Sequence, residues 1–400
     1  MVADSNVGQL SSSWAKASTQ TFSIFGSLGY RIGDLRFSAE GRYNIDRKRA
    51  QVFSVSNPTS APGVNQLIVG TTVPVAGLFP VIGPQFAKTF ESFAPRFTLD
   101  YQATPDLFLY ASASKGVRAG GFNTANAVSA TGILASEVPY ASEVPYSEES
   151  NWTYEVGFKS DWFDNRLRIN ASYFHVDWSN AQVSSFTDNP TAVNPVRIIR
   201  NIGSITSDGV ELQVEVKPVD LFGFGGSVVY SDVAFGAGAY DGGTITQCVV
   251  GTGTAATAAP GCPPVIVVTT PSGAVRAVPS LEGLRPARSV KLQWNLHATA
   301  DIPLSGDWAL SARVDLNHTG PSFANIINTF SFGERTLTNF RIGIGDDRFN
   351  ISVWGNNVFD VVYAQNAISQ PRAGLPFAFI VPEIYLGEGR RFGITASGKY

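Results

Sequence analysis

The 400-residue sequence is poor in charge and has no long apolar run. Asp, Glu, Lys and Arg make up only 15% of it, whereas about 25% is usual for soluble domains. No stretch approaches the roughly 18 consecutive apolar residues of a membrane helix, and the mean hydropathy is only +0.04. A net charge of −3 supplies no large basic face. These shortages exclude a helical membrane protein and argue against a nucleic-acid partner.

Cysteine and histidine are also scarce. The two cysteines, Cys248 and Cys262, lie in one segment rich in Gly, Ala, Thr and Pro, with no histidine beside them. That arrangement makes a poor metal site. A disulfide that closes the loop fits an oxidising compartment, and a pair of free thiols is the alternative that the sequence leaves open.

What the sequence has in abundance is alternation of apolar and polar residues, the period of a β-strand. From Leu35 to Ile45 every second residue is apolar or glycine, and the residues between them are polar. Clear copies of the pattern occupy 152–159, 210–217, 290–299, 308–317 and 390–400, and weaker ones 107–119 and 336–344. We count about thirteen such segments, several of them near the nine to eleven residues of a tilted transmembrane strand.

A soluble antiparallel sheet with one wet face would also alternate, but three features favour a membrane. The segments are long for soluble strands, and their polar positions carry large charges. Aromatic residues gather at strand ends, where interfacial girdles lie; these are Trp14, Tyr30, Tyr101, Trp152, Trp162, Tyr173, Trp178, Tyr230 and Trp308. The predicted fold is therefore all-β: a partial transmembrane antiparallel up-and-down β-barrel of about 13–14 strands.

The connections alternate between short and long, which predicts the topology. Short turns with Asp, Asn, Gly or Pro are expected at 31–34, 104–106, 162–165, 218–220, 303–307 and 345–347. Long loops are expected at about 48–87, 120–149, 179–207 and 233–287. Strand 150–161 should pair with 166–177, and 208–217 with 221–232. The repeat of ASEVPY within 135–146 is interpreted as an insertion tolerated in an exposed loop.

Few residues suggest chemistry, and none is assigned as catalytic, cofactor-binding or metal-ligating. His175, His297 and His318 sit on separate strands, and His175 shares a face with Asp177, which suggests an interfacial or a lumen role. Glu137, Glu143, Glu148 and Glu149 are interpreted as a solvated loop face, and Gly120-Gly121 as a turn. A charged, hydrated wall is predicted from Arg36, Glu40, Arg42, Glu155, Lys159, Arg166, Arg168, Glu211 and Glu215.

Four blocks of the sequence resemble TonB-dependent receptors. LFLYASASKGVRAGGFN (107–123) is similar to the family's "Y-x-S-x-S-x-G-F-R-x-G-G-F-N" block. Residues 150–177 resemble its "YE-x-G-x-K…R-L-x-x-N-x-x-x-F" hairpin, and 201–216 its "N-x-G-x-x-x-x-x-G-x-E" block. NNVFDVVY (356–363) is similar to "N-L-F-D-x-x-Y" near the family's C-terminus. A terminal aromatic, Tyr400, on the last alternating strand resembles the signal read by the barrel assembly machinery.

The resemblance implies a receptor in the cell outer membrane of a Gram-negative bacterium. It would take up a scarce, bulky ligand, foremost an iron–siderophore, with vitamins or glycans as other options. The implied partners are outer-membrane lipid, the assembly machinery through the strand ending at Tyr400, and TonB if the N-terminal region is present. The alternatives are a passive outer-membrane diffusion pore and an outer-membrane hydrolase, which would need a Ser/His/acid cluster on the wall. We do not predict an enzyme.

The family also carries an N-terminal plug domain and a short TonB-pairing box, for which the sequence has no room, because barrel-like sequence begins at residue 7. MVADSNVGQLSSSW shows neither the basic nor the apolar region of a secretory signal. Receptors of this class close with about 22 strands, compared with about thirteen here. We therefore expect residues 1–400 to be the C-terminal part of the barrel, without plug or N-terminal strands, and not to transport on their own.

Overall fold

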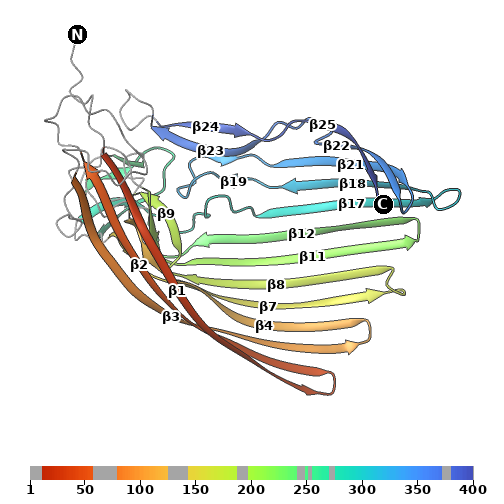
Figure 1. Cartoon of the computed structure of the whole chain (residues 1–400), viewed down its shortest axis with the longest axis horizontal. Helices are drawn as coiled ribbons and strands as arrows, with labels where there is room; N and C mark the ends of the chain where they lie inside the picture. The colour runs from red at the N-terminus through yellow and green to blue at the C-terminus, as the bar shows by residue number, and fades with distance from the viewer. Residues whose placement is uncertain are drawn as a thin grey trace, which may run out of the picture.

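The computed structural model describes residues 11–56, 79–124, 143–186, 197–240, 248–250, 255–269, 275–371 and 380–399. One antiparallel sheet of 13 strands dominates it (Figure 1), as the alternating sequence predicted. In order across the sheet the strands are β1 (Ser11–Ile32), β2 (Leu35–Ser56), β3 (Phe79–Thr104), β4 (Leu107–Arg118), β7 (Glu149–Trp162), β8 (Leu167–Ser179), β11 (Ile205–Val219), β12 (Phe222–Phe235), β17 (Leu292–Pro303), β18 (Ala309–Thr319), β21 (Arg335–Gly345), β22 (Phe349–Asn356) and β25 (Arg391–Gly398). No helix in the described ranges is long and apolar enough to cross a membrane.

The two ends of the sheet differ, as the connection lengths predicted. At one end, which we call the turn end, short turns join the strand pairs, including β7–β8 and β11–β12 in the predicted pairings. At the other, the loop end, the connections carry small hairpins of their own (Figure 1). These are β5 (Gly121–Phe122) with β6 (Pro145–Tyr146), β9 (Gln182–Phe186) with β10 (Arg197–Asn201), β13 (Val249–Val250) with β14 (Thr257–Ala258), β15 (Val265–Thr269) with β16 (Val275–Pro279), β19 (Ser322–Phe323) with β20 (Ser331–Phe332), and β23 (Ala364–Pro371) with β24 (Ile380–Leu386).

The register separates an apolar face of the sheet from a polar face. Leu35, Tyr43 and Ile45 of β2 share one face with Tyr101, Phe93 and Glu91 of β3, their cross-strand partners. Large apolar side chains on this face stay exposed across the whole sheet, for example Leu28, Val156 and Ile394 at 81%, 55% and 75%. An apolar surface of this extent indicates contact with something other than water, and lipid is the partner that a barrel wall meets.

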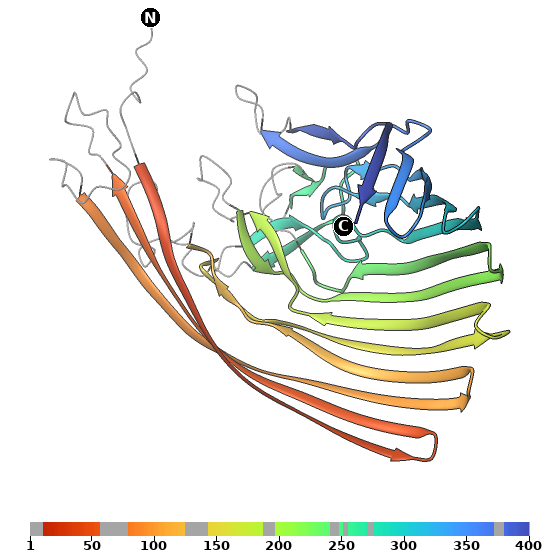
Figure 2. The same ribbon diagram turned by 45° about the vertical axis from the view of Figure 1, so that its right-hand side comes forward.

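The first three strands are longer than the sequence indicated, which overturns the predicted loop at 48–87. β2 runs on to Ser56 and β3 begins at Phe79, so the connection shrinks to residues 57–78, which lie outside the described ranges. The apolar alternation stops at Ile45, after which polar residues occupy both faces. The β1–β3 ribbon therefore continues as paired strand beyond its apolar part (Figure 2).

The packed core of the molecule lies at the loop end, not within the sheet. Buried apolar residues from three connections and from the adjoining ends of β11 and β12 form it; they are Ala181, Ile202, Ile205, Phe235, Ala239, Cys248, Leu281 and Ile327. The Cys248–Cys262 disulfide settles the choice between a bridge and free thiols and joins the segment to this core. Trp178, expected in an interfacial girdle, packs against the same core instead.

Candidate functional site

The predicted charged wall exists, and the register places its members on the polar face. Arg168, Glu215, Gly225 and His297 follow one another across β8, β11, β12 and β17. The Arg168 Nε lies 2.7 Å from Asp161 Oδ1, and His297 Nε2 lies 3.3 Å from Glu215 Oε2. Arg166 is the exception among the predicted residues. It sits in the β7–β8 turn, and its guanidinium bonds the Pro218 carbonyl of the neighbouring turn at 3.2 Å.

The polar face forms a hollow of about 290 Å³ at the turn end. Its lining carries both signs of charge, from Arg168, Glu215, His297, Asp301 and their neighbours in the β11–β12 turn. Mixed charge on a hydrated wall suits contact with polar ligands or with a polar protein surface rather than with lipid.

Two of the family-like blocks meet on this face. Tyr110 of the first block donates a 2.5 Å hydrogen bond to Glu155 of the second. The Lys159 ammonium lies 5.9 Å from the centroid of the same ring. A Cβ at Gly157 would come within 2.7 Å of the Tyr110 hydroxyl, so glycine leaves the space that the ring occupies. The spacing of Glu, Gly and Lys in the second block is thus explained by one aromatic ring from the first.

At the loop end, Asn123 closes the first block by joining separate connections. Its amide accepts from the Ile199 N–H and donates to the Ile199 carbonyl, both at 2.8 Å, and also donates to the Glu143 carbonyl at 2.8 Å. The Asn201 side chain links connections in the same way: it accepts from the Ser147 N–H and donates to the carbonyls of Ser147 and Asn180. The loops above the polar face are therefore fixed to one another by side-chain amides.

Glu143 and Glu149 are not the solvated loop face that the sequence suggested. The Glu143 carboxylate is buried and lies 2.9 Å from the equally sheltered guanidinium of Arg200. Glu149, also buried, accepts from the Gln182 backbone N–H and lies 3.4 Å from Arg118. Buried carboxylates require partners of this kind. Glu148 is half-buried, and Glu137 lies outside the described residues, as do residues 135–142 of the repeated segment.

Gly120 and Gly121 also differ from expectation, because they serve close packing rather than a turn. A Cβ at Gly120 would fall 2.2 Å from the Tyr146 carbonyl oxygen and 2.6 Å from the Phe90 ring. Gly121 begins β5, and a Cβ there would meet the Tyr146 hydroxyl. The pair lets β6 and the β3 strand approach the end of β4.

The C-terminal block forms a compact set of hydrogen bonds in the segment between β22 and β23. Asn357, buried and with a left-handed φ of 48°, bonds the Val361 N–H and carbonyl and the Glu388 carbonyl. Asp360 accepts from the Arg390 N–H at 2.8 Å. The block thus anchors the start of β25, whose predicted last residue, Tyr400, lies outside the described residues.

The three histidines are dispersed, as the sequence indicated. His175 lies on the apolar face, between Asp208 at 2.8 Å and Asp177 at 3.2 Å, and stacks on Tyr154. That position is on the opposite face of the sheet from the charged wall. His318 stacks on Trp294 with ring centroids 5.1 Å apart on the same face, whereas His297 faces the polar side. Sequence pattern did not identify Arg200, and no local signal at that position could have done so.

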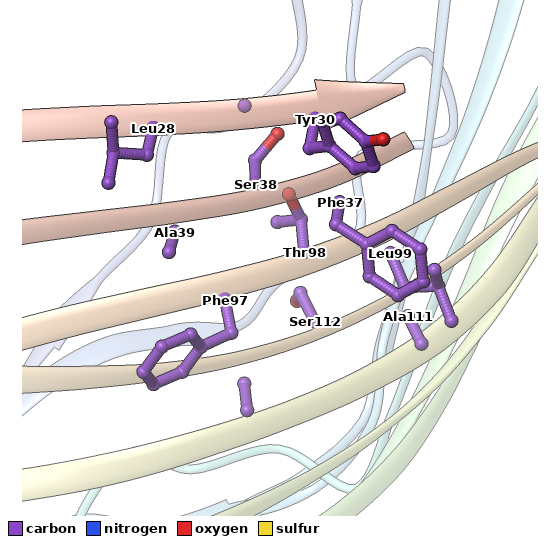
Figure 3. Close-up of a pocket in the computed structure, with 12 residues that line it drawn as sticks. Leu28, Tyr30, Phe37, Ser38, Ala39, Phe97, Thr98, Leu99, Ala111 and Ser112 are labelled. Carbon is purple, nitrogen blue, oxygen red and sulfur yellow. The ribbon is translucent and has the colours of Figure 1, made fainter. Parts of the chain in front are cut away.

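The apolar face is hollowed as well. A groove of about 700 Å³ lies over β1–β4. Figure 3 shows its lining, with Leu28, Tyr30, Phe37, Phe97 and Leu99 around small residues such as Ala39 and Ala111. Its lining is almost wholly apolar, which is typical of a surface covered by lipid chains.

Comparisons with known proteins agree with this geometry. The ferric yersiniabactin uptake receptor FyuA from Yersinia pestis matches 98% of this chain over 47% of its own, with 15% identity and a TM-score of 0.66. The match to the ferric-catecholate import receptor Fiu from E. coli K12 covers 96% of this chain and 45% of Fiu, with 16% identity and a TM-score of 0.58. The match to the siderophore receptor PiuA from Acinetobacter baumannii covers 91% of this chain and 43% of PiuA, with 15% identity and a TM-score of 0.52. The chain thus spans less than half the length of these receptors.

A family model described as "TonB dependent receptor-like, beta-barrel" matches residues 2–358. That family consists of outer-membrane transport receptors and not of enzymes. With nearly the whole chain matched by this β-barrel model, the protein belongs to the TonB-dependent receptor family.

Proposed function

We propose that residues 1–400 form the C-terminal wall of an outer-membrane receptor for a scarce, bulky ligand, namely an iron–siderophore complex. The similar structures are receptors for ferric yersiniabactin, ferric catecholates and siderophores, and this supports the ligand class. The proposed partners are outer-membrane lipid, the assembly machinery through β25, and TonB only where an N-terminal region is present.

The observation that carries the proposal is the interlocked loop end. Side-chain amides of Asn123 and Asn201, a buried ion pair and a disulfide-linked apolar core hold several connections in one arrangement above the polar wall. A preorganised set of loops reduces the entropic cost of binding a large ligand. A passive pore needs only an open lumen and gains nothing from such packing.

Ligand binding by the full chain in detergent micelles tests the proposal. Tryptophan fluorescence should show saturable quenching by a ferric catecholate or by ferric yersiniabactin, and none by cyanocobalamin or by the iron-free siderophores. E143Q, which removes the buried charge partner of Arg200, should weaken that binding. H318Q, on the apolar face, is the matched control and should not. Absence of saturable binding by any ferric siderophore would contradict the ligand class.

Transport is tested separately, because we propose that the chain alone does not transport. Cells that produce only these 400 residues should not accumulate radiolabelled iron from the bound complex. In planar bilayers the chain should give no defined conductance. A stable, ligand-independent open channel would instead support the passive pore.

A further inference from the structure

The apolar face of the β1–β3 ribbon has a sharp boundary at its loop end. The eleven residues from Leu35 to Ile45 span about 33–37 Å of strand, which at the usual tilt of 35–45° gives about 25 Å, the height of a barrel's apolar band. At that boundary Tyr43 donates a 2.8 Å hydrogen bond to Glu91. A tyrosine with its hydroxyl bonded at this level marks the interface between hydrocarbon and headgroups.

The next rows of the same face carry positive charge without any acid. The cross-strand neighbours of Arg47 are Gln20 and Thr89, and those of Arg49 are Ser18 and Ala87. In the row beyond, Lys16 pairs with Gln51. All three cationic side chains are exposed. Within the described part of the chain, none has a side-chain hydrogen bond or ion pair.

The opposite face at the same height is different. The ammonium groups of Lys48 and Lys88 lie 5.8 and 4.9 Å from the centroid of the buried Phe90 ring, so both make cation–π contacts with it. Farther along the sheet, near the same boundary of the apolar face, Asp232 is paired with Lys291 at 2.7 Å. At this height of the β1–β3 ribbon, the cations without a partner among the described residues therefore lie on the apolar-face side of β1 and β2.

We propose that Arg47, Arg49 and Lys16 bind the phosphate groups of a lipid in the leaflet at the loop end. Lipid chains that cover the apolar band place their headgroups at the height of these rows, a few residues beyond Ile45. Guanidinium groups bond phosphate oxygens in a bidentate manner. Two of them in successive rows, with no carboxylate in those rows, therefore suit a phosphate. The bound lipid would hold the long ribbon at a fixed height in the membrane.

Lipid retention by the full chain tests this site. The chain is purified from micelles of neutral detergent containing dimyristoyl phosphatidate or dimyristoyl phosphatidylcholine, and lipids that stay bound are counted by native mass spectrometry. R47Q/R49Q should lower the affinity for phosphatidate about tenfold or more, because basic residues near a membrane surface each add to anionic-lipid binding. Retention of phosphatidylcholine should not change.

The matched control is K48Q/K88Q, which removes the same charge at the same height on the other face. It should leave phosphatidate retention unchanged. Equal losses in both variants would show a net-charge effect and overturn the proposal, as would full retention by R47Q/R49Q. Displacement of the lipid by millimolar inorganic phosphate alone would point to a free-anion site and would also overturn it.

Discussion

At the scale of single residues, Asn123 shows how the family-like blocks work. Its side chain makes three hydrogen bonds, one to the backbone of Glu143 in its own connection and two to the backbone of Ile199 in the β8–β11 connection, and Asn123 is 8% exposed. Replacement by alanine would leave those buried backbone groups without partners, at about 1–3 kcal/mol for each unsatisfied group. We expect N123A to keep the sheet intact and to loosen the loop end.

Hydrogen exchange at the Ile199 amide measures this effect. Its protection should fall by about tenfold or more in N123A, since exchange reports the free energy of local opening. N295A is the control, because among the described residues the Asn295 side chain hydrogen-bonds Ser227 alone, on the exposed polar wall. Unchanged protection at Ile199 would show that the loops are held without Asn123.

Residue roles were predictable where a strand fixes the direction of the side chain. The alternation placed Glu155, Lys159, Arg168 and Glu215 on the polar face correctly. Within the loops the alternation does not predict the direction of a side chain. Glu143 looks like a solvated acid in sequence because its partner Arg200 is 57 residues away, and only the folded connections bring the two together.

Among the elements, the β21–β22 turn depends on one carboxylate. Asp346 accepts the N–H groups of Arg348 and Phe349 at 2.8 and 2.6 Å. These bonds hold the pKa of the Asp346 carboxyl below its ordinary value of 3.8. The depressed pKa favours the folded turn above the unfolded pKa, and the contribution is lost as the pH falls through the folded pKa.

The Phe349 amide should therefore lose exchange protection below about pH 3.8, after correction for intrinsic exchange rates. D346N should abolish that pH dependence, because the amide cannot ionise. D347N, one residue along the same turn, is the control and should preserve it. A Phe349 amide that titrates identically in wild type and D346N would contradict this role.

The disulfide is the second element whose role can be tested. Cys248 and Cys262 are 14 residues apart; Cys248 is buried in the loop-end core and Cys262 packs against it. Removing the disulfide that closes a loop of this length should cost about 3 kcal/mol of stability. In C248S/C262S we expect the Leu281 amide, bonded to the Ala239 carbonyl at 2.8 Å, to lose protection while β8 and β11 keep theirs. Loss throughout the sheet would show instead that the loop core supports the wall.

Strand prediction succeeded and failed for one physical reason. Alternation is visible only where one face meets lipid and the other meets water, which holds for Leu35–Ile45 and for the corresponding parts of the other strands. From Asp46 to Arg49 charged residues occupy both faces and the alternation is lost, so the strand looks like a loop although its pairing continues to Ser56. The loop-end hairpins were missed because they are short and their register depends on tertiary packing.

For the whole molecule, the direction of the edge strands limits how the sheet can close. All 13 strands pair antiparallel, and β1 and β25 are the two edges of the described sheet. Because the number is odd, both edges run from the loop end to the turn end. Direct pairing of β1 with β25 would be parallel, so antiparallel closure needs an odd number of further strands. A barrel of 22 strands would supply nine, the difference between 22 and 13.

This parity predicts how the 400 residues behave by themselves. Unpaired backbone groups cannot remain in hydrocarbon, so the two edges should stay open to water or detergent headgroups in micelles. Half of the amides of β1 and β25, those that point away from β2 and β22, should exchange rapidly, while both sets of amides in the interior strand β11 stay protected. Full protection of β1 and β25 in a monomeric sample would mean that the sheet closes on itself through a parallel seam, and the requirement for further strands would then fail.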